Sequence, residues 1–208
     1  MTKKINDWNM KEVERAESTW GNTYHQYTKD MFNFIISKGA SYLDLACGFG
    51  RFLRYLTLEK GLEVDYIGYD SSPDMIEKIR TNFPQFTHRT YCRDITLPIS
   101  HRQECILASA VLIHITLPEQ GKVLKAIKDS QPRAIAFDIN SPSERWLLKG
   151  DHFERIIMSG FRMTWQSHYL FTRKVMSLFP NYLLTTKFYK VHNNANRHKV
   201  VYLLERED

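Results

Sequence analysis

The stretch YLDLACGFGRF, residues 42–52, places two glycines directly after a short apolar run that contains an acid. Residues 42–45 have the pattern of a short buried strand, and a helical pattern begins at Arg51 and is closed by Gly61. Glycines after a strand often serve plain tight turns, because glycine adopts positive φ without steric cost. A strand, a glycine turn and a helix start together form a nucleotide-binding corner. We therefore predict that this corner binds a ligand.

Two common glycine motifs do not fit this corner. A P-loop requires Lys and then Ser or Thr after its last glycine, whereas Gly50 is followed by Arg51 and Phe52. A dinucleotide motif requires a small residue where Leu53 stands, and Leu53 is too large for the close helix–strand packing. The acid Asp44, which precedes the glycines, disfavours a phosphate and favours a ligand that carries a cation nearby.

The pattern that remains, Asp44-x-Ala46-x-Gly48-x-Gly50, resembles motif I of the class I S-adenosylmethionine (SAM)-dependent methyltransferases. Many members read LD(L/V)(G/A)CGxG(R/T) here, and Ala46 replaces the commoner glycine with another small residue. The resemblance implies an α/β fold with a single Rossmann-like, doubly wound sheet of seven strands, mostly parallel with an antiparallel last strand, and an N-terminal helical lid. It also implies SAM as the cofactor and S-adenosylhomocysteine (SAH) as the product. The resemblance covers residues 40–138 by motif and 171–205 by the order of elements.

Length and composition are consistent with one globular domain. The chain has 208 residues, with 43% hydrophobic and 13% aromatic residues. No apolar run approaches the ~18 residues of a membrane-spanning helix, and the start MTKKINDWNM lacks the apolar region of a signal peptide. Three cysteines, an odd number, indicate reduced thiols rather than disulfides. We expect a cytoplasmic protein with no membrane partner.

The net charge of +6 is compatible with nucleic acid, anionic membranes or acidic substrates as partners. The basic residues are spread along the chain without a tight block, so a solvated basic surface explains them equally well. A separate RNA-binding domain is usual in RNA methyltransferases, and 208 residues leave little room for one beyond a catalytic core of about 150 residues.

Strand and helix patterns alternate after the corner, as expected for a parallel α/β sheet. The strands are expected at residues 42–45, 64–69, 86–92, 105–109, 134–137, 182–191 and 199–205. The helices are expected at residues 11–19, 27–36, 51–60, 72–80, 171–178 and after Thr116, whose capping box is completed by Glu119. We divide the single domain, residues 1–208, into a helical lid (1–36), a SAM-binding core (37–138), a substrate-wall insertion (139–170), and a last helix with a terminal hairpin (171–208).

Acids at strand ends extend the expected cofactor site. Asp70 ends a strand about 20 residues beyond the glycines, where an acid accepts both ribose hydroxyls. By resemblance, Asp94 accepts from the adenine amino group, the Ile95 backbone meets the ring, and Met75 packs on the adenine face. Asp94 as a loop cap and Met75 as an ordinary helix-face residue are the alternatives. The expected cofactor-binding residues are Asp44, Ala46, Cys47, Gly48, Gly50, Arg51, Asp70, Ser71, Met75, Asp94, Ile95, Ser109 and Ala110.

The acceptor side is less well defined by sequence. Ser109-Ala110-Val111 replaces the Asn/Asp-Pro-Pro-Tyr/Phe typical of enzymes that methylate exocyclic base amines or glutamine amides. Catechol-type methyltransferases bind a metal with an Asp at this strand end and an Asp-Asn pair after the next strand. Asp138 and Asn140 resemble that pair, but Ser109 stands where the first Asp would be, so we predict no metal.

Five residues are candidates for contact with the acceptor. His114 is the candidate general base, and simple packing is its alternative. Tyr24 and Tyr27 in the lid are candidate substrate-binding residues, with covering the methionine moiety of the cofactor as the alternative. Arg162 and Trp165 in the insertion are candidates too, with core packing as the alternative.

The sequence thus favours a methyltransferase that acts on an oxygen or nitrogen atom of a small, planar or anionic molecule. An RNA methyltransferase and a non-catalytic SAM-binding protein are the alternatives. The oligomeric state and the methylated atom stay open.

Overall fold

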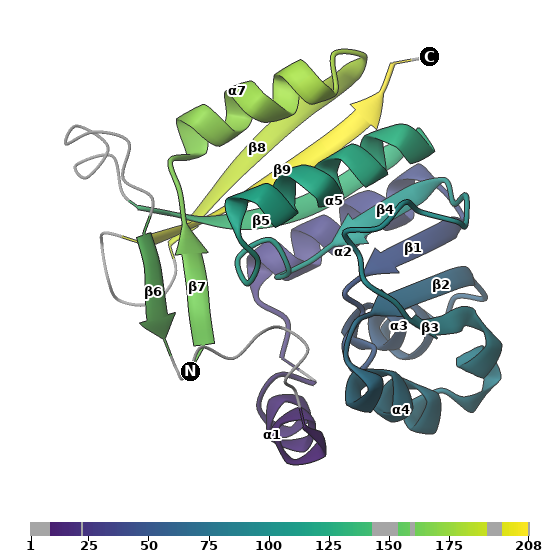
Figure 1. Ribbon diagram of the computed structural model, residues 1–208. Coiled ribbons are helices and arrows are strands. Elements are labelled where there is room, and N and C mark those ends of the chain that lie inside the picture. The colour runs from purple at the N-terminus through teal and green to yellow at the C-terminus, as the bar shows by residue number, and fades with distance from the viewer. Residues whose placement is uncertain (1–8, 22, 143–153, 159–160, 191–196, 208) are drawn as a thin grey trace.

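The computed structural model describes residues 9–21, 23–142, 154–158, 161–190 and 197–207. Within these ranges the strands form one sheet that branches at β5, and one path through it runs from β3 to β8 (Figure 1). Its strands, in spatial order, are β3 (Thr90–Cys92), β2 (Asp65–Asp70), β1 (Ser41–Leu45), β4 (Cys105–Ala108), β5 (Ala134–Pro142), β9 (Arg197–Arg206) and β8 (Tyr182–Lys190).

Five of these strands are parallel, and β9 runs antiparallel to both β5 and β8. The prediction of a mostly parallel sheet with an antiparallel last strand is confirmed. Strand β4 is buried along its whole length, and β1 is buried except at its first residue. Parallel strands are covered on both faces, which explains their nearly continuous apolar runs.

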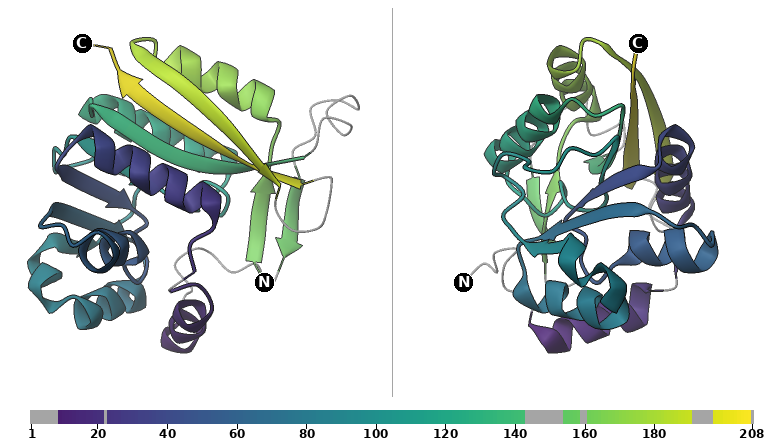
Figure 2. Two further views of the ribbon diagram at one scale, coloured as in Figure 1. Left: turned by 180° about the vertical axis from the view of Figure 1, so that it is seen from behind. Right: turned by 90° about the vertical axis from the view of Figure 1, so that its right-hand side faces the viewer.

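Helices cover both faces of the sheet (Figures 1 and 2). One face carries α2 (Gln26–Lys38), α3 (Arg51–Arg54) with the π-helical turn Tyr55–Glu59, and α4 (Pro73–Asn82). The other face carries α5 (Leu117–Ser130) and α7 (His168–Leu178). Helix α1 (Met10–Trp20) lies apart from these layers and contacts the corner after β1. The result is a three-layer αβα arrangement.

Sequence signals account for where the helices begin. Ser72 caps α4 by accepting the Met75 backbone N–H, and Pro73 follows at the first helical position. The capping box predicted at α5 is present, with the Thr116 side chain on the Glu119 N–H and the Glu119 carboxylate on the Thr116 N–H.

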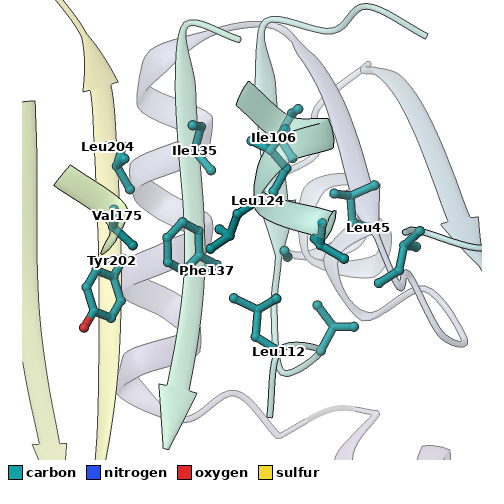
Figure 3. Close-up of a cluster of buried hydrophobic side chains, with 14 of the residues drawn as sticks. Leu45, Ile106, Leu112, Leu124, Ile135, Phe137, Val175, Tyr202 and Leu204 are labelled. Atoms are coloured by element: carbon teal, nitrogen blue, oxygen red, sulfur yellow. The ribbon is translucent and has the colours of Figure 1, made fainter. Parts of the chain in front are cut away.

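Two apolar cores fill the spaces between the layers. Side chains of β4, β5 and β9 meet those of α5 and α7 on one face, where Leu124 lies against the strands near Phe137 (Figure 3). On the other face, Met31, Phe32 and Ile35 of α2 pack on the sheet. These cores hold the carboxyl ends of β1, β2, β4 and β5 in fixed positions.

The prediction of a strand over residues 86–92 is wrong. Pro84–Arg89 forms a 3-10 helix, and β3 has only three residues. Pro84 explains the difference, since its ring fixes φ and removes a donor, so the chain enters a helical turn instead of a ladder.

The segment after β5 also differs from the expectation. Strand β5 continues past residue 137 to Pro142, because β9 pairs with it from Ala134 to Pro142. The predicted insertion contains two antiparallel strands, β6 (Glu154–Met158) and β7 (Phe161–Trp165), which the sequence did not indicate. Strand β7 joins the sheet beside the end of β5.

Candidate functional site

The turn after β1 has an unusual backbone. Ala46, Gly48 and Gly50 all adopt positive φ, at 62°, 54° and 93°. The turn is held from β2, where the Asp70 carboxylate accepts the Gly48 N–H and the Ser72 N–H, both at 2.9 Å. Gly50 is the N-cap of α3. A backbone that alternates in this way exposes its own groups to an approaching ligand.

The two glycines of the turn have different roles. A side-chain carbon at Gly50 would lie 2.9 Å from the Ile79 side chain, so Gly50 allows close packing against α4. A side-chain carbon at Gly48 would meet only the Met75 sulfur, at 3.8 Å. The space in front of Gly48 is therefore open.

A cavity of about 170 Å³ lies in front of this turn. Its walls come from α1, α2, the corner, the ends of β2 and β4 and the loop after β4. The lining residues are Ala16, Phe32, Asp44, Ala46, Cys47, Gly48, Phe49, Arg51, Phe52, Asp70, Met75, Leu107, Ser109, Ala110, Val111 and His114. Most of the predicted cofactor residues, and the predicted base, are thus brought to one cavity.

Four of the predicted cofactor residues do not line the cavity: Gly50, Ser71, Asp94 and Ile95. Asp94 is exposed, and its carboxylate accepts the Thr96 backbone N–H at 2.8 Å, the loop-capping contact that was its alternative. Ile95 is buried in the core under α5.

The two acids in the cavity wall differ in their surroundings. Asp44 is buried and accepts the Tyr66 hydroxyl at 3.0 Å. Burial, with a smaller contribution from the charge of Asp70, raises the pKa of Asp44 to about 7, although the Tyr66 hydroxyl and Arg51 oppose the shift. Burial also raises the pKa of Asp70, but its backbone hydrogen bonds oppose this. Asp44 is therefore the acid that exchanges its proton near neutral pH.

Arg51 brings a cation to the cavity. Its guanidinium donates to the Thr23 carbonyl at 2.6 Å and lies 5.6 Å from the Tyr24 ring centroid. Burial lowers the pKa of Arg51, and nearby Asp138 and Asp44 oppose that shift. Tyr24 reaches the Arg51 carbonyl at 3.4 Å. The predicted substrate residue Tyr24 does not line the cavity, but it contacts Arg51, which does.

His114 lies in the loop between β4 and α5. Burial lowers the pKa of His114 to about 4, the ammonium of Lys199 lowers it as well, and Asp138 opposes the shift. At neutral pH the imidazole is uncharged, with one ring nitrogen as donor and the other as acceptor. A base with so low a pKa is weak, because general bases work best near the operating pH.

Of the remaining substrate candidates, the structure describes the side chain of Tyr27 alone. The Tyr27 ring centroid lies 5.5 Å from the Lys199 Nζ, at the N-terminal turn of α2. Arg162 and Trp165 belong to β7, and their side chains lie outside the described residues.

Several residues of this region were missed by the sequence reasoning. Phe32, Phe49 and Phe52 line the cavity, and Lys199 pairs with Asp138 behind it. Phe49 stands between the two glycines and could have been noticed there. Lys199 could not, because its partner depends on the register between two strands far apart in sequence.

Helix α1 covers part of the cavity. Val13 and Ala16 are buried against Phe49 and Met75. At the end of the helix, the Glu17 carboxylate pairs with Lys78 of α4 at 2.9 Å and accepts from Asn82 at 2.7 Å. These contacts bind α1 to α4.

The described residues contain neither a cluster of metal ligands nor a membrane-spanning helix. No group of three or more His, Cys, Asp or Glu side chains in them is arranged to hold a metal ion. Likewise, none of the helices that the structure describes is long and apolar enough to cross a membrane.

Comparison with known proteins identifies this architecture. Residues 43–131 match the family model described as a methyltransferase domain. No curated protein sequence matches the chain.

Solved structures similar to the chain share its fold at low sequence identity. An S-adenosylmethionine-dependent methyltransferase from Clostridium acetobutylicum is 16% identical with a TM-score of 0.65, covering 95% of this chain and 99% of that one. Magnesium protoporphyrin IX methyltransferase from Synechocystis, with bound SAH, is 14% identical with a TM-score of 0.67, covering 98% and 96%. The small RNA methyltransferase HEN1 is 14% identical with a TM-score of 0.65, covering 88% of this chain and 25% of that one.

The glycine turn, the strand-end acids and the sheet order occur together with a match to the methyltransferase family model. The chain has the fold of the class I S-adenosylmethionine-dependent methyltransferases to which it is similar, and its residues 43–131 match a methyltransferase domain.

Proposed function

We propose that this protein transfers a methyl group from SAM to an oxygen or nitrogen atom of a small, planar or anionic molecule. The observation that carries the proposal is the single cavity in which the glycine turn, Asp70, Met75 and the end of β4 meet. A pocket that joins a glycine corner to the carboxyl ends of neighbouring strands is the expected ligand site of a doubly wound sheet.

The cavity residues fit the cofactor. The open space at Gly48 lets the backbone approach a ligand, and Met75 beside it offers a soft apolar surface for an adenine ring. The Asp70 oxygens accept the Gly48 and Ser72 backbone N–H groups, and each oxygen has a second lone pair that could accept from a ribose hydroxyl. Arg51 supplies a cation for a carboxylate. In this proposal Ser109 and Ala110, which line the cavity, lie beside the sulfonium. Asp94 and Ile95 do not line it, so their contacts with the adenine stay a prediction.

Bound SAM supplies an electrophilic methyl group on a sulfonium. The chain contributes orientation, since alignment of the acceptor lone pair with the methyl supplies most of the acceleration in a displacement of this kind. The acceptor atom gains the methyl, the carbon–sulfur bond breaks, and an O–H or N–H acceptor loses its proton.

The weak basicity of His114 limits which chemical groups can serve as the methyl acceptor. A neutral imidazole with a pKa of about 4 removes a proton effectively only from an acidic group. It can also orient the acceptor by a hydrogen bond. A phenol or an acceptor that is already ionised suits this site better than an aliphatic alcohol. The similarity to an enzyme that acts on magnesium protoporphyrin IX is compatible with a small-molecule acceptor.

RNA is the second candidate acceptor. The net charge of +6 and the similarity to a domain of HEN1 favour it. The cavity favours a small molecule, because it is bounded by α1 and aromatic side chains rather than by an open basic groove.

The three free thiols, Cys47, Cys92 and Cys105, fit a reducing compartment, so we propose the cytoplasm as the location.

Binding of SAH, measured by calorimetry, tests the cofactor. We expect micromolar affinity, on the order of −8 kcal/mol. The acceptor is then sought in two parallel assays with labelled SAM. One presents a metabolite library, preselected by thermal stabilisation in the presence of SAH, and the other presents small RNA. Methyl transfer to RNA alone would overturn the small-molecule proposal. SAH binding with no transfer in either assay would favour the non-catalytic alternative.

A matched pair of glycine variants shows where SAH binds. Gly48 and Gly61 both have positive φ, at 54° and 63°, and nothing lies within 4 Å of a side-chain carbon at Gly61. Gly48→Ala and Gly61→Ala should therefore lose similar stability, roughly 1–2 kcal/mol each. Only Gly48→Ala should weaken SAH binding, by at least tenfold. Unchanged affinity in folded Gly48→Ala would place the ligand elsewhere.

A further inference from the structure

The side chains on the face of the sheet under α2 change from apolar to polar near the cavity. Alternate residues of β5 and β9 on this face are apolar: Ala134, Ala136, Val201 and Leu203. The next positions at the same two-residue spacing are polar and buried: Asp138, Asn140 and Lys199. The apolar surface thus gives way to a charged cluster where the strands reach the site.

Lys199 and Asp138 form an ion pair that is shielded from water. The Lys199 Nζ lies 2.6 Å from the Asp138 Oδ2 and donates to the Asn140 Oδ1 at 3.2 Å. Asn140 lies directly opposite Lys199 in the antiparallel register. A buried ion pair seldom stabilises a fold more than an apolar pair of the same size would. Its presence therefore indicates a role other than stability.

The second oxygen of Asp138 reaches the cavity wall. The Ala110 backbone N–H donates to the Asp138 Oδ1 at 2.6 Å. Ala110 has φ of 57°, a conformation that is unfavourable for any residue with a Cβ and that persists only when its surroundings hold it. Ala110 and its neighbours Ser109 and Val111 line the cavity at the end of β4. Asp138 holds this segment in place.

The cation of the pair also contacts α2. The Lys199 Nζ lies 5.5 Å from the Tyr27 ring centroid, within the range of a cation–π contact. The Asp138 Oδ1 accepts the Ala110 N–H, and the Asp138 Oδ2 lies in ion-pair contact with Lys199 without a hydrogen bond of good geometry, so the carboxylate is placed to orient its neighbours. The pair joins β5, β9, the end of β4 and α2 at one point.

We propose that Lys199 and Asp138 are positioning residues of the methyl-transfer site, which hold Ala110 in the shape that the bound cofactor requires. This role rests on the proposed function, because it assigns the pair to the cofactor end of that cavity. Asp138 fixes the segment directly, and Lys199 orients Asp138.

Two variants and a control test the pair. Lys199→Met removes the cation and leaves Asp138 buried without it. The double variant Asp138→Leu, Lys199→Met buries no charge, so it should fold even if the single variant does not. Lys125→Met is the control, because Lys125 forms an exposed ion pair with Asp129 on α5. The measurements are hydrogen–deuterium exchange at the Ala110 amide, SAH affinity by calorimetry, and the thermal midpoint.

The proposal expects faster Ala110 exchange and about tenfold weaker SAH binding in the double variant, with cooperative unfolding retained and no change in the control. Unchanged Ala110 exchange would overturn it, as would faster exchange with unchanged SAH affinity, which is the pattern of a purely structural pair. A parent protein that binds no SAH would contradict the proposed function and this role together. Faster Ala110 exchange in the variant would then still establish the contact, so the two failures are distinguishable.

Discussion

At the scale of single residues, two acids of the same type have different properties because of their partners. Asp44 and Asp70 are both buried at the carboxyl ends of neighbouring strands. Asp70 accepts two backbone N–H groups, which favour its ionised form, whereas Asp44 accepts one tyrosine hydroxyl. Asp44, with a pKa of about 7, changes its charge near neutral pH. The affinity for a cationic ligand should therefore depend on pH in this range.

SAM binding should weaken as the pH falls below about 7. Burial raises the pKa of Asp44 to about 7 in the free protein, so the group is protonated below that pH. A cationic ligand favours the carboxylate, and binding must then release a proton, which costs up to about tenfold in affinity for each pH unit. Calorimetry between pH 6 and 8, in two buffers of different ionisation enthalpy, measures both the affinity and the proton release.

Two substitutions make this pH dependence specific. The SAM affinity of Asp44→Asn should stay constant as the pH falls below about 7. Asp65→Asn, at the exposed start of the same strand as Asp70, should behave as the parent protein does. The same pH dependence in Asp44→Asn as in the parent would show that another group is responsible.

At the scale of elements, the two N-terminal helices have different relations to the site. Helix α2 is part of the core, since Met31, Phe32 and Ile35 are buried against the sheet. Among the described residues, helix α1 contacts the corner, α3 and α4, through Val13, Ala16 and Glu17. We therefore propose that the lid predicted over residues 1–36 consists of α1 alone, and that α2 belongs to the core. Closing helices of this kind exclude water and complete a site.

Trypsin should cut α1 readily in the free protein and slowly when SAH is bound. Lys11 and Arg15 are exposed cleavage sites on α1. A bound ligand under Ala16 adds contacts that favour the docked helix, and cleavage reports the undocked population. Mass spectrometry of the fragments over time measures the protection.

A site on α5 provides the control for this experiment. Lys125 is exposed on a helix that packs in the core, so its cleavage should be slow in both states. Glu17→Gln, which weakens the pairing with Lys78, should speed cleavage of α1 without SAH. Equal resistance of α1 with and without SAH would mean that the helix is a permanent scaffold.

At the scale of the whole molecule, the site lies at the carboxyl ends of the strands, beyond the apolar cores between the three layers. The cores on both faces of the sheet are apolar, and the buried charged groups gather at the carboxyl ends of the strands. Such groups are expensive to bury, so they make the stability of the whole fold depend on pH.

His114 should reduce the free energy of unfolding as the pH falls from about 6.5 to about 4. Its pKa is about 4 in the folded protein and 6.5 without the fold, so in this window only the unfolded chain takes up the proton. The loss is at most about 1.4 kcal/mol for each pH unit. Urea unfolding of His114→Gln and the parent, compared across this window, measures it.

The comparison separates His114 from other groups. Asp44 titrates in the opposite sense, since its raised pKa means that the folded protein takes up the proton, but its effect cancels in the difference between variant and parent. His88→Gln, at an exposed histidine, should follow the parent curve. A constant difference between His114→Gln and the parent at every pH would contradict the burial of a neutral imidazole.

Short-range patterns made much of the fold and site predictable. The parallel strands, the capping box at Thr116 and the glycine corner each depend on residues within a few positions of one another. Asp44 and Asp70 could be placed because parallel strands bring their carboxyl ends to the same edge. Asp94 was harder, since its carboxylate has a local partner in Thr96 that the strand pattern does not reveal.

Determined by the sequence alone were the α/β class, the ligand-binding corner and the acids at two strand ends, because local periodicity and turn chemistry specify them. The tertiary structure decided the rest: the β6–β7 hairpin, the docking of α1 over the corner, and the pairing of Lys199 with Asp138. These features depend on the register of strands and on packing between segments far apart in the chain. Local residue preferences carry no record of such contacts, since each contact exists only after the sheet has formed.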